Sequence, residues 1–81
     1  MVLPQKGDFV HINLTSGAII DFSVVLIIQK PYNRFIIIGF AGKKNQLTAL
    51  YYDQTTNVMK YSFNPTGTSG GGRTEVVKLK N

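Results

Sequence analysis

The residues best suited to chemistry lie in one short basic and aromatic turn, Lys30-Pro31-Tyr32-Asn33-Arg34. Proline presets a turn and asparagine tolerates left-handed backbone, so this segment reverses the chain. Single-stranded nucleic acids are bound by base stacking on aromatic or guanidinium planes, by hydrogen bonds to base edges and by cations at phosphates. Tyr32 is therefore a candidate to stack a base, Asn33 to bond its edge, and Lys30 and Arg34 to meet phosphate. The same residues also fit an ordinary solvated turn, so both interpretations stay open.

The chain as a whole is basic. Nine lysines and arginines against four aspartates and glutamates give a formal net charge of +5. The basic surface extends to a later loop and to the C-terminal region, through Lys43, Lys44, Arg73, Lys78 and Lys80. Such an excess favours phosphate-bearing partners whatever their sequence. It also keeps a small domain soluble, so charge alone leaves two explanations.

Residues for catalysis or metal binding show no productive spacing. His11 is the only histidine, it lies within a predicted strand, and the chain has no cysteine. The four acidic residues are scattered, and no two have a spacing that demands a carboxylate pair. The run Gly70–Arg73 lacks the lysine and hydroxyl residue of a phosphate-binding loop. We therefore expect no enzymatic activity, no metal and no cofactor.

Hydrophobic patterning indicates the elements that position these residues. Alternating apolar positions and runs of β-branched and aromatic residues predict six strands, over 9–14, 18–29, 34–40, 46–52, 58–63 and 73–79. No window has helical periodicity, so the predicted fold is all-β, a small and strongly bent antiparallel barrel of five to six strands. The second strand is about twice the usual length, so it must bend, as barrel strands do, often at a bulge.

One domain is predicted over residues 1–81, with a short arm at 1–8 and a flexible glycine-rich loop at 64–72. The N-terminal residues do not resemble a secretory signal. The most apolar run, 24–28, is far shorter than the roughly 20 residues of a membrane-spanning helix. We therefore expect a soluble, cytoplasmic protein without a membrane partner.

Two predicted strands are apolar on both faces, at Val24–Ile28 and at Ile36–Ile38. A small barrel has only one interior, so part of this surface lies outside it. Leaving about four such side chains in water forgoes roughly 6–12 kcal/mol, which is comparable to the whole stability of a small domain. We therefore expect a homo-oligomer that covers the outer faces. The alternative is that the arm and the glycine-rich loop cover them.

The first half of the chain resembles the first motif of the Sm and Sm-like (LSm) RNA-binding proteins. That motif has an alternating strand, a glycine, a long bent strand and a loop ending in a hydrophobic residue and asparagine. The matching residues here are Val10, Ile12, Leu14, Gly17, Ile20, Val24, Tyr32 and Asn33. The segment from Gly17 to Asn33 is one residue longer than the family's spacing, which a bulge could absorb.

The resemblance implies a non-catalytic, single-stranded RNA-binding protein that acts as a homo-oligomeric ring. It implies base contacts by Tyr32 and Asn33, with Arg73 nearest to the family's second RNA-contacting position. Lys30 and Arg34 complete the expected RNA-binding set. The alternative from a different functional class is a structural or protein-interaction module that forms a β-sheet-mediated oligomer without binding nucleic acid.

Overall fold

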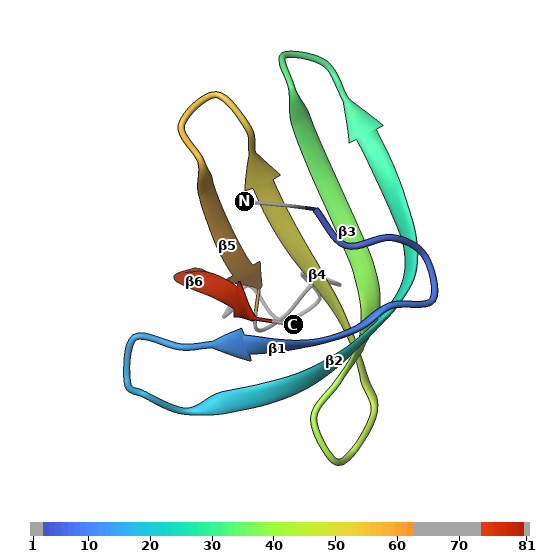
Figure 1. Ribbon diagram of the computed structural model, residues 1–81, viewed down its shortest axis with the longest axis vertical. Coiled ribbons are helices and arrows are strands. Elements are labelled where there is room, and N and C mark those ends of the chain that lie inside the picture. The colour runs from blue at the N-terminus through green and yellow to red at the C-terminus, as the bar shows by residue number, and fades with distance from the viewer. Residues whose placement is uncertain (1–2, 63–73, 81) are drawn as a thin grey trace.

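The computed structural model describes residues 3–62 and 74–80, which form six antiparallel strands and no helix. The strands follow one another around a closed barrel in chain order, and β1 pairs with β6 to close it (Figure 1). They are β1 (Phe9–Asn13), β2 (Ile19–Lys30), β3 (Arg34–Ala41), β4 (Gln46–Asp53), β5 (Val58–Ser62) and β6 (Thr74–Lys80). The predicted all-β barrel is confirmed, and each described strand boundary lies within one residue of its predicted position.

Alternation along the strands separates a buried interior from an outer surface. In β1, Val10 and Ile12 point inward while Phe9 is exposed, and in β4 Leu50 and Tyr52 point inward. The five largest fully buried side chains come from five different strands: Ile12, Phe22, Ile37, Leu50 and Met59. The core is therefore built jointly by the strands, as period-two patterning requires.

A bulge in β2 explains why its second half loses the alternation. Val24 pairs with Gly39 and Leu26 pairs with Ile38, so Val25 is an extra residue without a partner on β3. Val24 points inward before the bulge and Ile27 packs toward the core after it, so the inward set shifts by one residue. The predicted bend is confirmed: β2 pairs with β1 over Ile19–Ser23 and with β3 over Phe22–Lys30, with the bulge at Val25 interrupting the second ladder.

Gly39 permits the close approach of β2 and β3 beside this bulge. A Cβ atom at Gly39 would lie 2.0 Å from the carbonyl oxygen of Ser23 and 2.8 Å from Cζ of the Phe22 ring. Its φ is not positive, so the requirement is for space rather than for an unusual backbone conformation. A side chain there would force the two strands apart.

The described part of the N-terminal arm packs on the core. Leu3 contacts the core and Pro4 is buried. The amide of Gly7 donates to the carbonyl oxygen of Val24 at 2.9 Å. The amide of Val24 donates to the carbonyl oxygen of Asp8, also at 2.9 Å. The arm therefore continues the pairing of β1 with β2 as far as Val24, and it does not cover the outer side chains beyond the bulge.

Those outer side chains remain partly in solvent. Val25 is 37% exposed, Leu26 39% and Ile28 40%, and they lie beside the half-buried Ile36 and Ile38 of β3. The prediction that β2 and β3 carry apolar residues on both faces is thus confirmed. The glycine-rich loop at 64–72 lies outside the described residues, and cover by a second copy stays a prediction. Among the described residues, no helix is long and apolar enough to cross a membrane.

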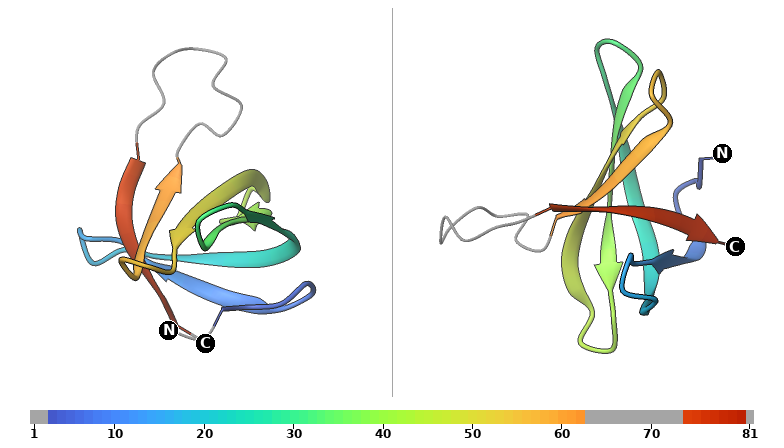
Figure 2. Two further views of the ribbon diagram at one scale, coloured as in Figure 1. Left: turned by 90° about the horizontal axis from the view of Figure 1, so that it is seen from above. Right: turned by 90° about the vertical axis from the view of Figure 1, so that its left-hand side faces the viewer.

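The two hairpins that carry the candidate site extend from the same end of the barrel. The turns of the β2–β3 hairpin and the β4–β5 hairpin lie at the same end in two perpendicular views. β6 runs at a large angle to the strands of these hairpins (Figures 1 and 2). The β3–β4 ladder joins the two hairpins along its whole length, from Arg34–Asp53 to Ala41–Gln46. Side chains from both turns can therefore act on one ligand.

Candidate nucleic-acid interface

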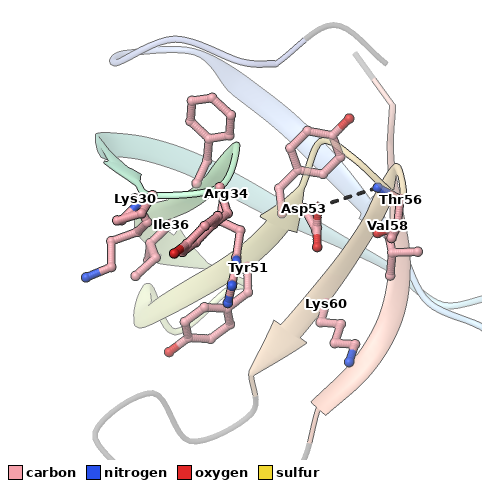
Figure 3. Close-up of a pocket in the computed structure, with 12 residues that line it drawn as sticks. Lys30, Arg34, Ile36, Tyr51, Asp53, Thr56, Val58 and Lys60 are labelled. Atoms are coloured by element: carbon pink, nitrogen blue, oxygen red, sulfur yellow. Dashed lines mark hydrogen bonds between the residues drawn. The ribbon is translucent and has the colours of Figure 1, made fainter.

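A groove of about 740 Å³ lies on the outer side of the sheet between these two hairpin turns (Figure 3). It is lined by Lys30, Pro31, Tyr32, Arg34, Phe35, Ile36, Tyr51, Tyr52, Asp53, Thr56, Val58 and Lys60. The lining combines aromatic rings, aliphatic side chains and cations. A groove of this size with mainly apolar walls and a few polar groups is typical of a ligand-binding site.

The floor of the groove is a row of directly paired residues that crosses three strands. Ile36 of β3 pairs with Tyr51 of β4, and Tyr51 pairs with Lys60 of β5. Direct cross-strand partners lie on the same face of a sheet with Cβ atoms about 5 Å apart. Tyr51 is 40% exposed, so its ring is partly accessible to a ligand. The row places an aromatic ring between an aliphatic side chain and a cation.

The β2–β3 turn forms one wall, and its backbone is unusual. Tyr32 has φ of 64° and Asn33 has φ of 58°, and a left-handed backbone is uncommon for a residue as bulky as tyrosine. The carbonyl oxygen of Asn33 accepts a hydrogen bond from the amide of Gln54 at 2.9 Å, which ties this turn to the β4–β5 turn. Residues held in strained backbone cluster at functional sites, so this turn is a candidate for ligand contact.

The ring of Tyr32 projects into solvent next to a cation. Tyr32 is 80% exposed, and the guanidinium carbon of Arg34 lies 5.6 Å from the centre of its ring. This is a cation–π distance, worth about 0.5–1 kcal/mol at an exposed site. The pair presents an aromatic plane and a guanidinium plane together, and both kinds of plane stack on nucleobases.

The charge of the groove is positive because three cations face one carboxylate. Lys30, Arg34 and Lys60 line it, and Asp53 is the acidic residue of the lining. Asp53 Oδ1 accepts hydrogen bonds from the amides of Thr55 at 2.9 Å and Thr56 at 3.4 Å, so this carboxylate caps its own turn (Figure 3). The cations remain available for an anionic ligand.

The β4–β5 turn forms the second wall and is held by side-chain hydrogen bonds. The Tyr52 hydroxyl donates to Asn57 Oδ1 at 2.7 Å, and Asn57 takes a left-handed φ of 58°. The Tyr52 ring also lies 6.4 Å from the Phe35 ring, between ring centres. This wall is therefore fixed by the barrel core before any ligand binds, which lowers the entropic cost of binding.

Three of the five RNA-binding residues predicted from the sequence lie together in the groove. Lys30, Tyr32 and Arg34 all line the groove. Asn33 lies in the adjoining turn and is not among the lining residues, and Arg73 lies outside the described residues. Asn33 has a structural contribution in any case, since its left-handed backbone and its carbonyl oxygen shape the turn.

Tyr51 and Lys60 also line the groove, and neither was predicted as a site residue from the sequence. Both lie at outward positions of predicted strands, and this outward position is the sequence feature that could have identified them. Their proximity depends on the hairpin register, in which Asp53 pairs with Val58 across a four-residue turn. A prediction that assumed a four-residue turn would have placed Tyr51 opposite Lys60.

The histidine does meet a carboxylate, but on another surface. His11 Nδ1 lies 2.9 Å from Asp21 Oδ1, with the two side chains 40% and 59% exposed. The pair joins β1 and β2, and neither residue lines the groove. Within residues 3–62 and 74–80, no three histidine or acidic side chains gather in a way that could hold a metal ion.

No protein-family model, curated protein or solved structure matches this chain.

Proposed function

We propose that this protein binds single-stranded RNA in the groove between the β2–β3 and β4–β5 turns, without catalysing a reaction. The observation that carries this proposal is one arrangement of side chains. Two partly or largely exposed tyrosine rings, Tyr32 and Tyr51, lie beside three cations in a single groove. Aromatic rings and cations in one groove are the two components of sequence-tolerant single-strand binding.

Each component has a distinct role in the proposed complex. A base stacks on Tyr51, where the aliphatic side chains of Ile36 and Val58 extend the apolar floor. A second base stacks on Tyr32. The phosphates are met by the cations that border these rings. Duplex nucleic acid fits this arrangement less well because its bases are already stacked on one another.

The first test is RNA binding as a function of salt. Labelled oligouridine and oligoadenine are titrated with the protein, and fluorescence anisotropy gives the dissociation constant at several salt concentrations. If the three groove cations neutralise three phosphates, log K falls with log salt with a slope of about −2, since each phosphate contributes about −0.7 for a single strand. Undetectable binding at low salt refutes the proposal.

The second test removes the stacking planes. Tyr51→Ala and Tyr32→Ala each weaken RNA binding by about 5- to 150-fold, because base stacking on an aromatic side chain is worth about 1–3 kcal/mol. Phe9→Ala is the matched control, since Phe9 is a 60% exposed aromatic residue on β1 that does not line the groove. Equal affinities for all three variants and the unmodified protein contradict the assigned site, provided that circular dichroism shows each variant folded.

The alternative function, a protein-interaction module, is favoured by the exposed apolar residues of β2. It predicts self-association without salt-sensitive RNA binding, and it predicts that Tyr32→Ala is harmless. The homo-oligomeric ring implied by the Sm resemblance stays a prediction. Light scattering on the purified protein tests it by giving the number of chains in each particle.

A further inference from the structure

The second half of β2 has an edge that the barrel leaves unpaired. Residues Ile19 to Ser23 pair with β1, and Val24 is bonded by Gly7 and Asp8. Beyond the bulge, residues 26–30 have ladder partners on β3 only, within the part of the chain that the structure describes. Figure 1 shows this half of β2 at the margin of the molecule, with no strand on its outer side. Its main-chain groups there remain available for another strand.

The middle of this edge carries none of the usual protection against pairing. Natural edge strands are shielded by bulges, lysines and prolines. Here the bulge at Val25 lies at one end of the stretch, and Lys30 and Pro31 lie at the other. Between them stand Leu26, Ile27, Ile28 and Gln29, of which Leu26 and Ile28 are exposed at 39% and 40%. Exposed, β-prone and uncharged residues on an unpaired edge favour pairing with another strand.

A second copy of the same edge fits this surface in an antiparallel register centred on Ile28. In that register Ile28 faces its own counterpart, Leu26 faces Lys30 of the other copy, and Ile27 faces Gln29. Apolar side chains meet apolar side chains or the aliphatic stem of a lysine. The two Lys30 residues lie about 14 Å apart along the strands, at about 3.4 Å per residue. This separation exceeds the Debye length of about 8 Å at physiological salt, so their repulsion is largely screened.

We propose that two copies of this chain associate through residues 26–30 of β2, antiparallel and with two-fold symmetry about Ile28. This proposal goes beyond RNA binding and does not depend on it. An edge of five residues is only about 17 Å long, so the area it buries is well below the roughly 800 Å² per partner of a standard interface. The dimer is therefore expected to dissociate on dilution. The pairing lengthens the sheet at its edge, and Lys30 is the one groove-lining residue within the paired stretch.

The symmetry distinguishes this dimer from the ring implied by the Sm resemblance. A two-fold contact uses the same edge on both copies and closes at two subunits. A ring uses two different edges on each copy, so that each subunit contacts two neighbours. A substitution at the two-fold centre therefore meets itself in the dimer, and it meets a different residue in a ring.

The test uses charges of opposite sign at the two-fold centre. Ile28→Lys and Ile28→Glu each place two like charges directly opposite one another, which destabilises cross-strand pairs, and raise the dimer dissociation constant about ten-fold or more. An equimolar mixture of the two variants pairs lysine with glutamate and restores a dimer. The matched control is Ile19→Lys, since Ile19 is 64% exposed on the same strand but its edge is paired with β1.

Sedimentation velocity and light scattering over a range of protein concentrations, without RNA, measure the particle mass. A concentration-dependent dimer of the unmodified chain and of Ile19→Lys, monomeric Ile28 variants and a heterodimer in the mixture support the proposal. A monomer at all concentrations, a particle larger than a dimer, an Ile28→Lys variant as dimeric as the unmodified chain, or a mixture that stays monomeric overturns it. Circular dichroism verifies that each variant is folded. These outcomes are independent of the RNA-binding assay, so either proposal can fail alone.

Discussion

Gly39→Ala tests the packing that bends the barrel. The new Cβ would lie 2.0 Å from the carbonyl oxygen of Ser23, whereas ordinary contact begins at 3.4 Å. The two strands would have to separate by roughly 1.4 Å at the Val24–Gly39 pair, because the obstructing atom belongs to the backbone and cannot rotate away. The same Cβ would press on the Phe22 ring, which is fully buried.

The expected loss in the free energy of unfolding has two contributions. Overpacking a core typically costs about 1–3 kcal/mol, and each ladder hydrogen bond lost near Gly39 adds about 0.5–1.5 kcal/mol. We expect Gly39→Ala to lower the free energy of unfolding by about 3 kcal/mol or more. A chain of this length has about 4–12 kcal/mol in total. The expected loss corresponds to a decrease in Tm of about 12–24 °C.

Urea unfolding followed by circular dichroism measures this loss, and Gly42→Ala provides the matched control. Gly42 has φ of 75° and no atom within 4 Å of its Cβ position, so alanine there carries only backbone strain of about 1–2 kcal/mol. Gly39→Ala is expected to be the more damaging of the two variants. A Gly39→Ala variant within 1 kcal/mol of the unmodified chain, or no less stable than Gly42→Ala, would refute the account of the bend.

Three further predictions concern single side chains. Tyr52→Phe removes the hydroxyl bonded to Asn57 Oδ1 and lowers the free energy of unfolding by about 1 kcal/mol in urea titrations; an unchanged midpoint would contradict this. Asp21→Asn breaks the exposed pair with His11 and changes the free energy of unfolding by less than about 1 kcal/mol, so a larger loss would show that the pair is structural. Lys60→Ala reduces the magnitude of the salt slope for RNA binding by about 0.7, and Lys6→Ala, outside the groove, leaves it unchanged.

The strands were predictable because their patterning is strong and local. Period-two alternation identified the inward residues of β1 and the first half of β2, and the change of pattern after Val24 marked the bulge. Gly17, in the turn between β1 and β2, has a positive φ of 93°, which glycine adopts without a steric cost. Each of these features is decided by residues that are close in the sequence.

The candidate site was predicted only in part, because it depends on register between strands. Lys30, Tyr32 and Arg34 lie in one turn and could be nominated together. Tyr51 and Lys60 join them through two ladders whose registers no short motif specifies. The left-handed backbone of Tyr32 was also missed, since the sequence preference for that conformation belongs to asparagine and glycine rather than to tyrosine. RNA binding, the Sm resemblance and the ring stay predictions.

The closure of the barrel by its last strand has a consequence for how the protein is made. β6 pairs with β5 and also with β1, so the sixth strand bridges the fifth strand and the first. During synthesis the first five strands emerge before this bridge exists. Until β6 pairs with them, β1 and β5 each have one edge without a partner strand. Pairs distant in sequence also form late because their loop closure is entropically costly. The nascent polypeptide therefore completes its barrel only after β6 has left the ribosome, and termination before residue 74 leaves an open sheet prone to aggregation.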